Sequence, residues 1–353
     1  MSNGPSSNPA IYDTNVLVQV VPNLLTSQQF LLDRFFPYTV MSDSEKVSID
    51  VDVGKRRMSP FVSPYNEGRL VEQRRYQTDT FTPPYIKDKR APDLMKPVRR
   101  MIGERIGGNM TGAQREMANL EAEMTDQVDM LKRRMEWMAG QVLMSGTVTI
   151  IGDGYPEALI DFGRDPTLTV VNAGNTTWTA ANIAAGTASP TGDIEAMQTQ
   201  ILQMSGGTCT DIIFTPSSWA GFKLDPELKG AIVFPKLQEF PNAINVGPAI
   251  AKGAVFKGTW GQYALWLYND WYVDDNNVQQ PMLVNGQVIM SGPDLMGTRA
   301  FGQIKDPAFN YEAVPFAPKS WISEDPPQRF IMLQSAPVVI PSRVNASASL
   351  QVV

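Results

Sequence analysis

A chain of 353 residues is long enough to bury a large core and to divide into two or three domains. Apolar residues make up 43% of it and charged residues 19%, as in a soluble globular protein, and no apolar run is long enough to span a membrane. The sequence has no histidine and one cysteine, Cys209. Histidine-based catalysis, most zinc sites and an internal disulfide framework are therefore excluded, and we expect no cofactor.

The net charge of −6 is unevenly distributed along the chain. Residues 55–105 contain thirteen Lys/Arg against six Asp/Glu, whereas residues 150–353 contain eleven against eighteen. An acidic chain does not favour broad wrapping of nucleic acid. The opposite signs predict a contact between the basic segment and the acidic remainder, within one subunit or between neighbours.

The N-terminal region contains one short predicted helix and one predicted strand. Residues 1–10 are mostly Ser, Asn, Gly and Pro, with little to bury. FLLDRFF, residues 30–36, has residues at helical spacing and predicts a helix from about Ser27 to Phe36, which Pro37 ends. The adjacent aromatic residues Phe35, Phe36 and Tyr38 either dock on another surface or pack in the local core. VSIDVDV, residues 47–53, alternates apolar and polar residues and predicts a half-buried strand.

Residues 54–93 are rich in proline and arginine, with Arg-Arg pairs at 56–57 and 74–75. Strand-like pieces in this segment predict a long two-stranded loop, which implies a function or a partner because such long loops are unusual in compact domains. Aromatic residues interleave with the arginines, as in proteins that bind single-stranded nucleic acid. Because the rest of the chain is acidic, we favour a protein partner, with nucleic acid as the alternative.

Residues 111–145 predict one long amphipathic helix, with apolar residues at steps of three and four from Met117 to Val142. Thr111 and Gln114 have the spacing of a capping box, and Ser145-Gly146 provides a stop. The apolar stripe is rich in methionine and the opposite face carries mixed charge. On a chain otherwise full of short strands, such a helix is expected to act as a strut.

Beyond this helix the pattern becomes mixed α/β. Residues 147–165 predict two strands around a turn, and residues 193–205 predict a helix. CTDIIFTP (209–216) predicts a strand, followed by a short helix over PSSWAGFK. Asn285-Gly286 predicts a β-hairpin between LV and QVIM. The final ASLQVV predicts pairing with an earlier strand.

Six stretches carry a resemblance to a known family: FLLDRFFP (30–37), FTPPYIKDKRAP (81–92), DFGRD (161–165), IIFTPSSWAGFK (212–223), KGTWGQYALWLYNDWYV (257–273) and PKSWISEDPPQRFIMLQSAPVVIPS (318–342). Their order and number resemble the lambda-like phage major capsid protein family, which has the Hong Kong 97-type capsid fold. The match spans nearly the whole chain from about residue 30. These are packing and loop motifs without a catalytic signature, so the resemblance implies a structural protein and not an enzyme.

The resemblance implies an α+β fold and a division of the chain into five parts. It implies an N-terminal arm (1–46), an extended β loop (47–95), a peripheral domain (96–189) with a spine helix at 111–145, a mixed α/β axial domain (190–310), and strands that return to the peripheral domain (311–353). The extended loop is expected to lie over the peripheral domain of an adjacent subunit. About thirty residues precede FLLDRFFP, so we expect no built-in scaffolding segment.

The implied function is that of the head protein of a tailed bacteriophage. Such a protein assembles with itself into pentamers and hexamers of an icosahedral shell around double-stranded DNA. The implied partners are other copies of the chain, a scaffolding protein during assembly, the portal, a decoration protein, and packaged DNA through weak non-specific contact, with no membrane. The implied location is the virion, with assembly and procapsid maturation in the host bacterial cytoplasm.

We predict that the extended loop gives cationic side chains to the spine helix of a neighbouring subunit. The predicted donors are Arg56, Arg57, Arg69, Arg74, Arg75 and Lys87, and the predicted acceptors lie on the helix side that carries Glu121 and Asp129. The alternatives are single-stranded nucleic-acid binding by residues 55–105, a carboxylate-based hydrolase, and a tail or decoration protein. No paired-acid arrangement supports the hydrolase, and the order of the motifs disfavours the tail or decoration protein.

Overall fold

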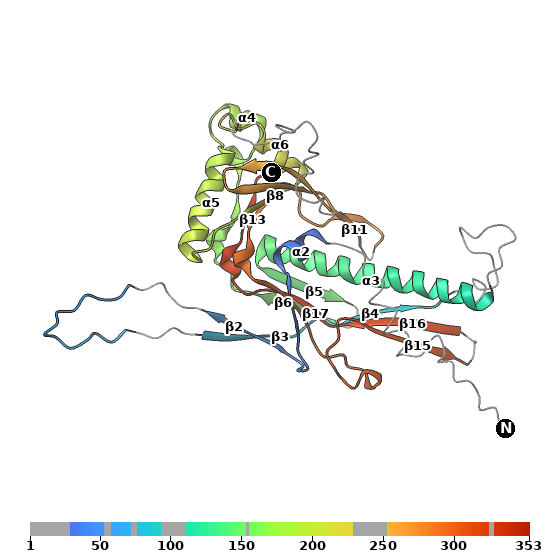
Figure 1. The fold of residues 1–353 in the computed structure, drawn as a ribbon. Coiled ribbons are helices and arrows are strands. Elements are labelled where there is room, and N and C mark those ends of the chain that lie inside the picture. Colours follow the sequence, from blue (N-terminus) through green and yellow to red (C-terminus); the bar gives the residue numbers. More distant parts are fainter. Residues whose placement is uncertain are drawn as a thin grey trace, which may run out of the picture.

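The computed structural model describes residues 29–52, 58–71, 76–92, 111–152, 155–228, 253–274, 276–324 and 328–353. One long helix, α3 (Gly112–Ser145), crosses the molecule (Figure 1). A mixed layer of strands and helices lies at its C-terminal end, and a layer of strands follows its length. The hairpin of β2 (Val47–Asp52) and β3 (Tyr76–Phe81) projects away from this body.

The remaining elements of the described residues belong to small sheets and short helices. One sheet has the order β1 (Tyr38–Met41), β14 (Gly297–Phe301), β17 (Pro337–Pro341), and another β15 (Ala317–Ser323), β16 (Gln328–Ser335), β4 (Ile86–Arg90). A six-stranded sheet has the order β7 (Thr169–Val171), β18 (Ala348–Gln351), β13 (Gln287–Ser291), β8 (Asp211–Phe214), β10 (Tyr263–Tyr268), β9 (Ala254–Trp260). Two hairpins are β5 (Thr147–Gly152) with β6 (Tyr155–Asp161), and β11 (Trp271–Val273) with β12 (Gln279–Pro281). The shorter helices are α2 (Phe30–Phe35), α4 (Ala180–Ala184), α5 (Pro190–Met204), α6 (Pro216–Phe222), and the 3-10 turns η1 (Pro166–Leu168), η2 (Gly174–Thr176), η3 (Pro293–Leu295), η4 (Pro307–Phe309), η5 (Val344–Ala346).

Helix α3 begins and ends where the sequence predicts. The Thr111 hydroxyl accepts a hydrogen bond from the Gln114 N–H, and the Gln114 side chain accepts one from the Thr111 N–H, which completes the capping box. Gly146 ends the helix in the left-handed conformation, with φ of 74°. Both predictions about the helix ends are confirmed.

The apolar stripe of α3 contacts two different layers along its length. In its N-terminal half, Leu120, Met124 and Val128 pack with Ile331 and Leu333 of β16. Its C-terminal half is buried against α2, β17 and the inner face of the six-stranded sheet. The helix therefore connects the layer that contains β16 to the six-stranded sheet.

The six-stranded sheet is covered on both faces. Along β8, Ile212 and Phe214 point to the layer of α5 and α6, whereas Ile213 points to the core shared with α2 and α3. All four residues of β8 are buried, because this strand lies between two layers of side chains. The helix and strand predicted from residues 193–223 are thus confirmed as α5, β8 and α6, although α5 begins earlier, at Pro190.

The predicted hairpin at Asn285-Gly286 is wrong. Gly286 does form a turn, with φ of 82°, but β13 pairs with β8 and β18 and not with the residues before the turn. Met282 and Leu283 are instead buried beside α3, in the shared core. Their burial removes the first strand of the hairpin.

Strands β18 and β4 both pair with strands from distant parts of the chain. Strand β18 pairs with β7 and β13, so the C-terminus joins the six-stranded sheet. Strand β4 falls within the predicted extended loop of 47–95, yet it pairs with β16 beneath α3. The domain boundaries themselves stay a prediction.

Arg164, in the DFGRD stretch, caps the C-terminus of α3 from a distant part of the chain. Its guanidinium donates hydrogen bonds to the carbonyl oxygens of Leu143 and Met144, and to the hydroxyls of Thr169 and Ser349. These carbonyls have no partner inside the helix, and a cation favours the negative end of the helix dipole. Burial lowers the pKa of Arg164 to about 10, so the side chain still carries its charge at neutral pH.

We expect Arg164→Met to lower the free energy of unfolding by about 3 kcal/mol, because the Leu143 carbonyl loses its donor and the Met144 carbonyl keeps only the Ser349 hydroxyl. The measurement is urea unfolding of the isolated subunit. Lys223→Met, which changes an exposed side chain near the end of α6, is the control, with an expected effect within about 0.5 kcal/mol. Equal effects of the two substitutions would contradict the capping role.

Candidate functional site

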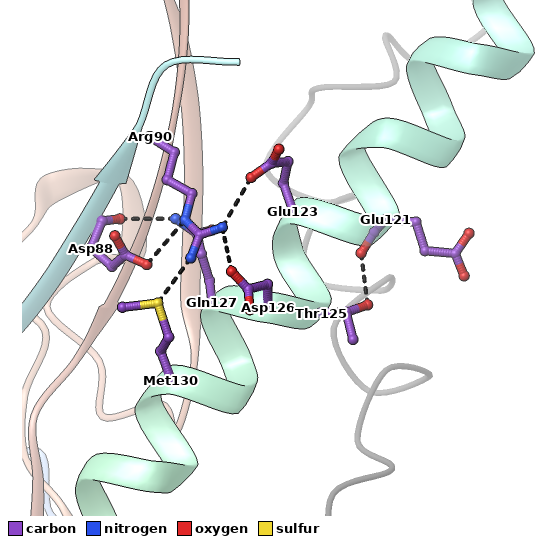
Figure 2. Close-up of polar contacts among 8 residues, drawn as sticks. All are labelled: Asp88, Arg90, Glu121, Glu123, Thr125, Asp126, Gln127 and Met130. Atoms are coloured by element: carbon purple, nitrogen blue, oxygen red, sulfur yellow. Dashed lines mark hydrogen bonds and ion pairs between the residues drawn. The ribbon is translucent and has the colours of Figure 1, made fainter. Parts of the chain in front are cut away.

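The candidate site is the charged face of α3 together with β4, which packs beside it (Figure 2). Glu121, one predicted acceptor, is exposed, and its carboxylate points away from the other side chains drawn in Figure 2. Its backbone carbonyl accepts a hydrogen bond from the Thr125 hydroxyl at 2.7 Å. Asp129, the other predicted acceptor, is partly buried, and its Oδ1 has no hydrogen-bond partner among the described residues. Of the two, Glu121 is the more accessible to another subunit.

Arg90 of β4 forms ion pairs with Glu123 and Asp126, the acidic residues of α3 between these two positions. Its Nη1 lies 3.0 Å from Glu123 Oε2 and 2.7 Å from Asp126 Oδ2, and its Nε lies 3.4 Å from Asp88 Oδ2. Burial acts to lower the pKa of Arg90, but the hydrogen bonds to Glu123 and Asp126 outweigh it and raise the pKa overall. Part of the acidic helix face is therefore neutralised inside the subunit.

The predicted donors lie in different places. Arg69 is exposed near the tip of the β2–β3 hairpin. Lys87 is exposed on β4, with its Nζ 5.1 Å from the centre of the Tyr85 ring, so it lies beside the subunit's own spine helix and not on the hairpin. Arg56, Arg57, Arg74 and Arg75 lie outside the described residues. The roles of all six donors and of both acceptors stay predictions.

The hairpin tip, residues 58–71, exposes large apolar side chains. Phe61, Tyr65 and Leu70 are each more than 95% exposed, and Met58 is 87% exposed. Isolated apolar residues on a surface are normal, but several together on one extended loop indicate a contact with a partner. From the sequence, the arginines of this segment are the predicted contact residues. The structure shows that its tip also exposes apolar side chains.

Helix α2 sits where α3, the six-stranded sheet and β14 meet. Glu136 of α3 accepts hydrogen bonds from the Leu31 N–H at 2.8 Å and the Leu32 N–H at 3.0 Å, and from the Tyr268 hydroxyl at 3.1 Å. Its carboxylate thus serves the first turn of α2, which has no side-chain cap of its own. Phe35 and Phe36 pack in the subunit's own core, which confirms the second of the two expectations for them, whereas Tyr38 on β1 is 54% exposed.

An ion pair connects α2 to the six-stranded sheet. Arg34 donates to Asp211 Oδ1 from both Nε, at 3.2 Å, and Nη2, at 2.9 Å. Asp211 is 1% exposed, and Trp266 Nε1 donates to the same oxygen at 2.8 Å. On the other side of α2, Arg299 of β14 pairs with Asp33 at 2.6 Å. Three elements are therefore held together by one six-residue helix.

Sequence reasoning missed Arg90 and Glu136, the two side chains that carry these networks. Arg90 could have been found from the alternation of IKDKR, which places it on the same strand face as Ile86 and Asp88. Glu136 stands in a methionine-rich stripe, between Met135 and Met138, where a charged residue is unexpected. A lone acid in an apolar stripe was a signal for a buried hydrogen-bonded carboxylate.

The described residues hold no cluster of three or more side chains suited to a metal ion. Among the same residues, no helix is both long and apolar enough to cross a membrane.

The family comparison decides the identity of this fold. A family described as "Phage major capsid protein E" matches residues 13–352. The chain belongs to this family. It is a structural protein of the phage head and not an enzyme, as the resemblance implied.

Individual relatives of this capsid chain agree with the family assignment. The major capsid protein of Escherichia phage lambda is 25% identical over 348 residues, which cover 97% of this chain and 99% of the relative. That of Escherichia phage N15 is 26% identical, with 94% and 96% covered. A crystal structure of a prophage capsid protein from Escherichia coli CFT073 matches with a TM-score of 0.70 at 19% identity, covering 96% and 99%. The fold is of the Hong Kong 97 type, as expected.

The capsid subunit is expected to lose stability as pH rises, through Glu136. Burial raises the pKa of Glu136 to about 7 from an ordinary value of 4.5. A carboxyl whose pKa is raised in the folded state stabilises that state fully below pH 4.5, and the contribution is lost as pH rises through 7. Between pH 5 and pH 8 the free energy of unfolding should fall by up to about 3 kcal/mol from this group. Urea unfolding at both pH values measures it.

Glu136→Gln, which keeps one oxygen acceptor, should remove this part of the pH dependence. Glu157→Gln, which changes an exposed acid on β6, is the matched control and should leave it unchanged. An identical pH dependence for the wild type and for Glu136→Gln would show that Glu136 does not titrate in this range.

Proposed function

We propose that this major capsid protein assembles into the pentamers and hexamers of an icosahedral shell that encloses the double-stranded DNA of a tailed phage. The observation that carries the proposal is the β2–β3 hairpin, which leaves the body and ends in an exposed apolar tip (Figure 1). A two-stranded hairpin without a third layer is marginally stable in water. A neighbouring subunit would supply the missing layer.

The contacts between subunits are spread over several surfaces. The β2–β3 hairpin and helix α3 lie on different sides of the subunit (Figure 1). Each such contact is weak alone, and the free energy of a closed shell is the sum of many of them. Electrostatic pairs then set register and steer association more than they add affinity.

We assign the charged part of this contact to the hairpin arginines and the exposed acids of α3. Glu121 is exposed and forms no ion pair with Arg90, which favours it as an acceptor. Asp129 is partly buried and lies near Lys132, so it is the weaker acceptor of the two. On the donor side, Arg69 is fully on the surface of the tip.

The further partners of this proposal are a scaffolding protein during assembly, the portal, a decoration protein and the packaged DNA. The acidic net charge supports only weak, non-specific contact with DNA. Assembly would take place in the host bacterial cytoplasm, and the finished shell is the virion capsid.

Reversing the charge of Arg74 and Arg75 together, to Glu, should reduce the yield of closed shells at least ten-fold while the subunit stays folded. Like charges would then face the acidic surface of the neighbour, and such juxtapositions cost several kcal/mol. The yield is measured by sedimentation and electron microscopy of the chain expressed with its scaffolding protein. Arg74→Gln with Arg75→Gln, which only removes the charge, should give an intermediate yield.

The matched control reverses Lys223 and Lys257, which lie on the layer of the six-stranded sheet, by the same amount of charge. The control should assemble in near-normal yield. Normal shells from the Arg74/Arg75 reversal would eliminate the charged contact. No closed shells from the wild-type chain under any scaffolded condition would overturn the proposed function itself.

A further inference from the structure

The three-stranded sheet of β15, β16 and β4 has two faces of different chemistry. Alternate residues of a strand point to opposite faces, and Asp88 and Arg90 point toward α3 (Figure 2). Lys87 and Lys89 therefore belong to the opposite face, which we call the lysine face. The strand register adds to the lysine face Ala317, Lys319, Trp321 and Ser323 of β15, and Gln328, Phe330, Met332 and Gln334 of β16.

The lysine face carries positive charge and no acid, since none of the residues that form it is acidic. Lys319 is neutralised by Asp306, whose Oδ2 lies 2.7 Å from the Lys319 Nζ. Lys87 and Lys89 are both exposed, and neither forms an ion pair with a described residue. On a chain with a net charge of −6, this face is a local positive surface that can attract an anionic partner.

Aromatic rings hold both lysines in position. The Lys89 Nζ lies 4.0 Å from the centre of the Phe330 ring and 5.3 Å from that of Trp321. The centres of these two rings are 5.5 Å apart. The Lys87 Nζ lies 5.1 Å from the centre of the Tyr85 ring. A cation over a ring is attracted to it, and a lysine restrained in this way loses less side-chain entropy when it pairs with an acid.

The ring beneath Lys87 is itself fixed by hydrogen bonds. The Tyr85 hydroxyl donates to Gln334 Oε1 at 2.7 Å, and Gln334 Nε2 donates to Asp306 Oδ2 at 2.9 Å. Gln334 is 1% exposed, so this chain of hydrogen bonds lies within the core. The fold thus fixes the position of a cation whose charge no described acid of the subunit neutralises.

The spacing of the two lysines indicates the shape of the partner. Lys87 and Lys89 are two residues apart on one strand, a separation of about 6.6 Å. Acids at alternate positions of an extended segment have the same spacing. The partly exposed Trp321, Phe330 and Met332 lie beside the lysines and offer apolar surface. An extended segment with alternate acids and an apolar side chain therefore fits this face.

Two other occupants fit less well. Single-stranded nucleic acid stacks its bases on free aromatic rings, but the Lys89 ammonium already lies over the Phe330 ring. The hairpin of a second copy is rich in arginine, and its approach would place like charges next to Lys87 and Lys89. The charge and the covered ring favour a different, acidic protein.

We propose that the lysine face binds an extended acidic segment of a partner protein other than this chain. Carboxylates at alternate positions of the segment pair with Lys87 and Lys89, and an apolar side chain lies against the aromatic rings. This gives Lys87 a different role from the predicted contact with a neighbouring spine helix. The inference goes beyond self-assembly, because it assigns a surface of each folded subunit to another protein. A shell would repeat the site in every copy, so a partner with several such segments would gain avidity.

A labelled synthetic peptide of alternating glutamate and threonine is the probe, and its binding to the folded subunit at low salt is measured by fluorescence anisotropy. Lys87→Gln with Lys89→Gln should weaken binding at least about ten-fold, because two charged pairs are lost. Lys223→Gln with Lys257→Gln, which removes the same charge from the layer of the six-stranded sheet, should leave binding nearly unchanged. Equal losses from the two double variants would reduce the effect to net charge and overturn the site.

Two further comparisons test the spacing and the rings. A peptide of the same composition with its glutamates in one block should bind several-fold more weakly, and equal binding would overturn the alternate spacing. Phe330→Leu, which removes a ring beneath Lys89 but stays apolar, should weaken binding of the alternating peptide about three-fold. Unchanged binding would overturn the role of the ring. If thermal unfolding shows that Phe330→Leu does not fold, the exposed lysine variants decide alone.

The remaining outcomes identify the occupant. Tighter binding of single-stranded oligothymidine than of the peptide, with the same dependence on Lys87 and Lys89, would assign the face to nucleic acid and overturn the protein partner. Sedimentation of the purified chain alone should show equal self-association for the wild type and for Lys87→Gln with Lys89→Gln. Weaker self-association of the double variant would assign the face to a second copy and overturn the inference. A failure of the wild-type chain to form shells would overturn the proposed function, whereas peptide binding by the subunit would still decide this inference.

Discussion

Glu136 accepts hydrogen bonds from the first turn of α2 while its carboxylate is almost completely enclosed by the core. Leaving such an acceptor buried without hydrogen bonds would cost several kcal/mol. Helix α2 can therefore move away only if Glu136 also becomes exposed to solvent. Arg34 and Arg299 then extend the fixed helix to the six-stranded sheet and to β14. The orientation of the two halves of the subunit thus depends on one short helix and one acid.

Part of the charged surface of α3 is already paired within the subunit. Arg90 neutralises Glu123 and Asp126, and in doing so clamps the N-terminal half of the helix to β4 and β16. Charges already paired inside the subunit cannot pair across an interface without competition. The side chains of α3 that Arg90 does not pair include the exposed Glu121 on one side and the exposed Arg133 and Arg134 on the other. This division limits which face of the helix a neighbour can use.

Local rules predicted the elements whose signals lie within a few residues. The capping box of Thr111 and Gln114, the stop at Gly146 and the short helix over FLLDRFF all follow from spacing and side-chain type. The hairpin at Asn285-Gly286 failed because Leu283 is buried against α3, a tertiary contact that no local pattern contains. Arg90 and Glu136 were missed for the same reason: each acts on a partner 33 or more residues away. Family resemblance supplied the global arrangement that periodicity could not.

The hairpin tip leaves apolar side chains exposed in the single chain. An aromatic residue more than 95% exposed on a two-stranded loop gains nothing from folding alone, since its apolar surface is as wet as in the unfolded chain. Burying one such side chain contributes about 2 kcal/mol, which is too little to hold two subunits irreversibly. A closed shell repeats that contact in every subunit, so the sum is large while each bond can still break and correct its register. An anchor of moderate strength therefore suits a shell that must close without errors.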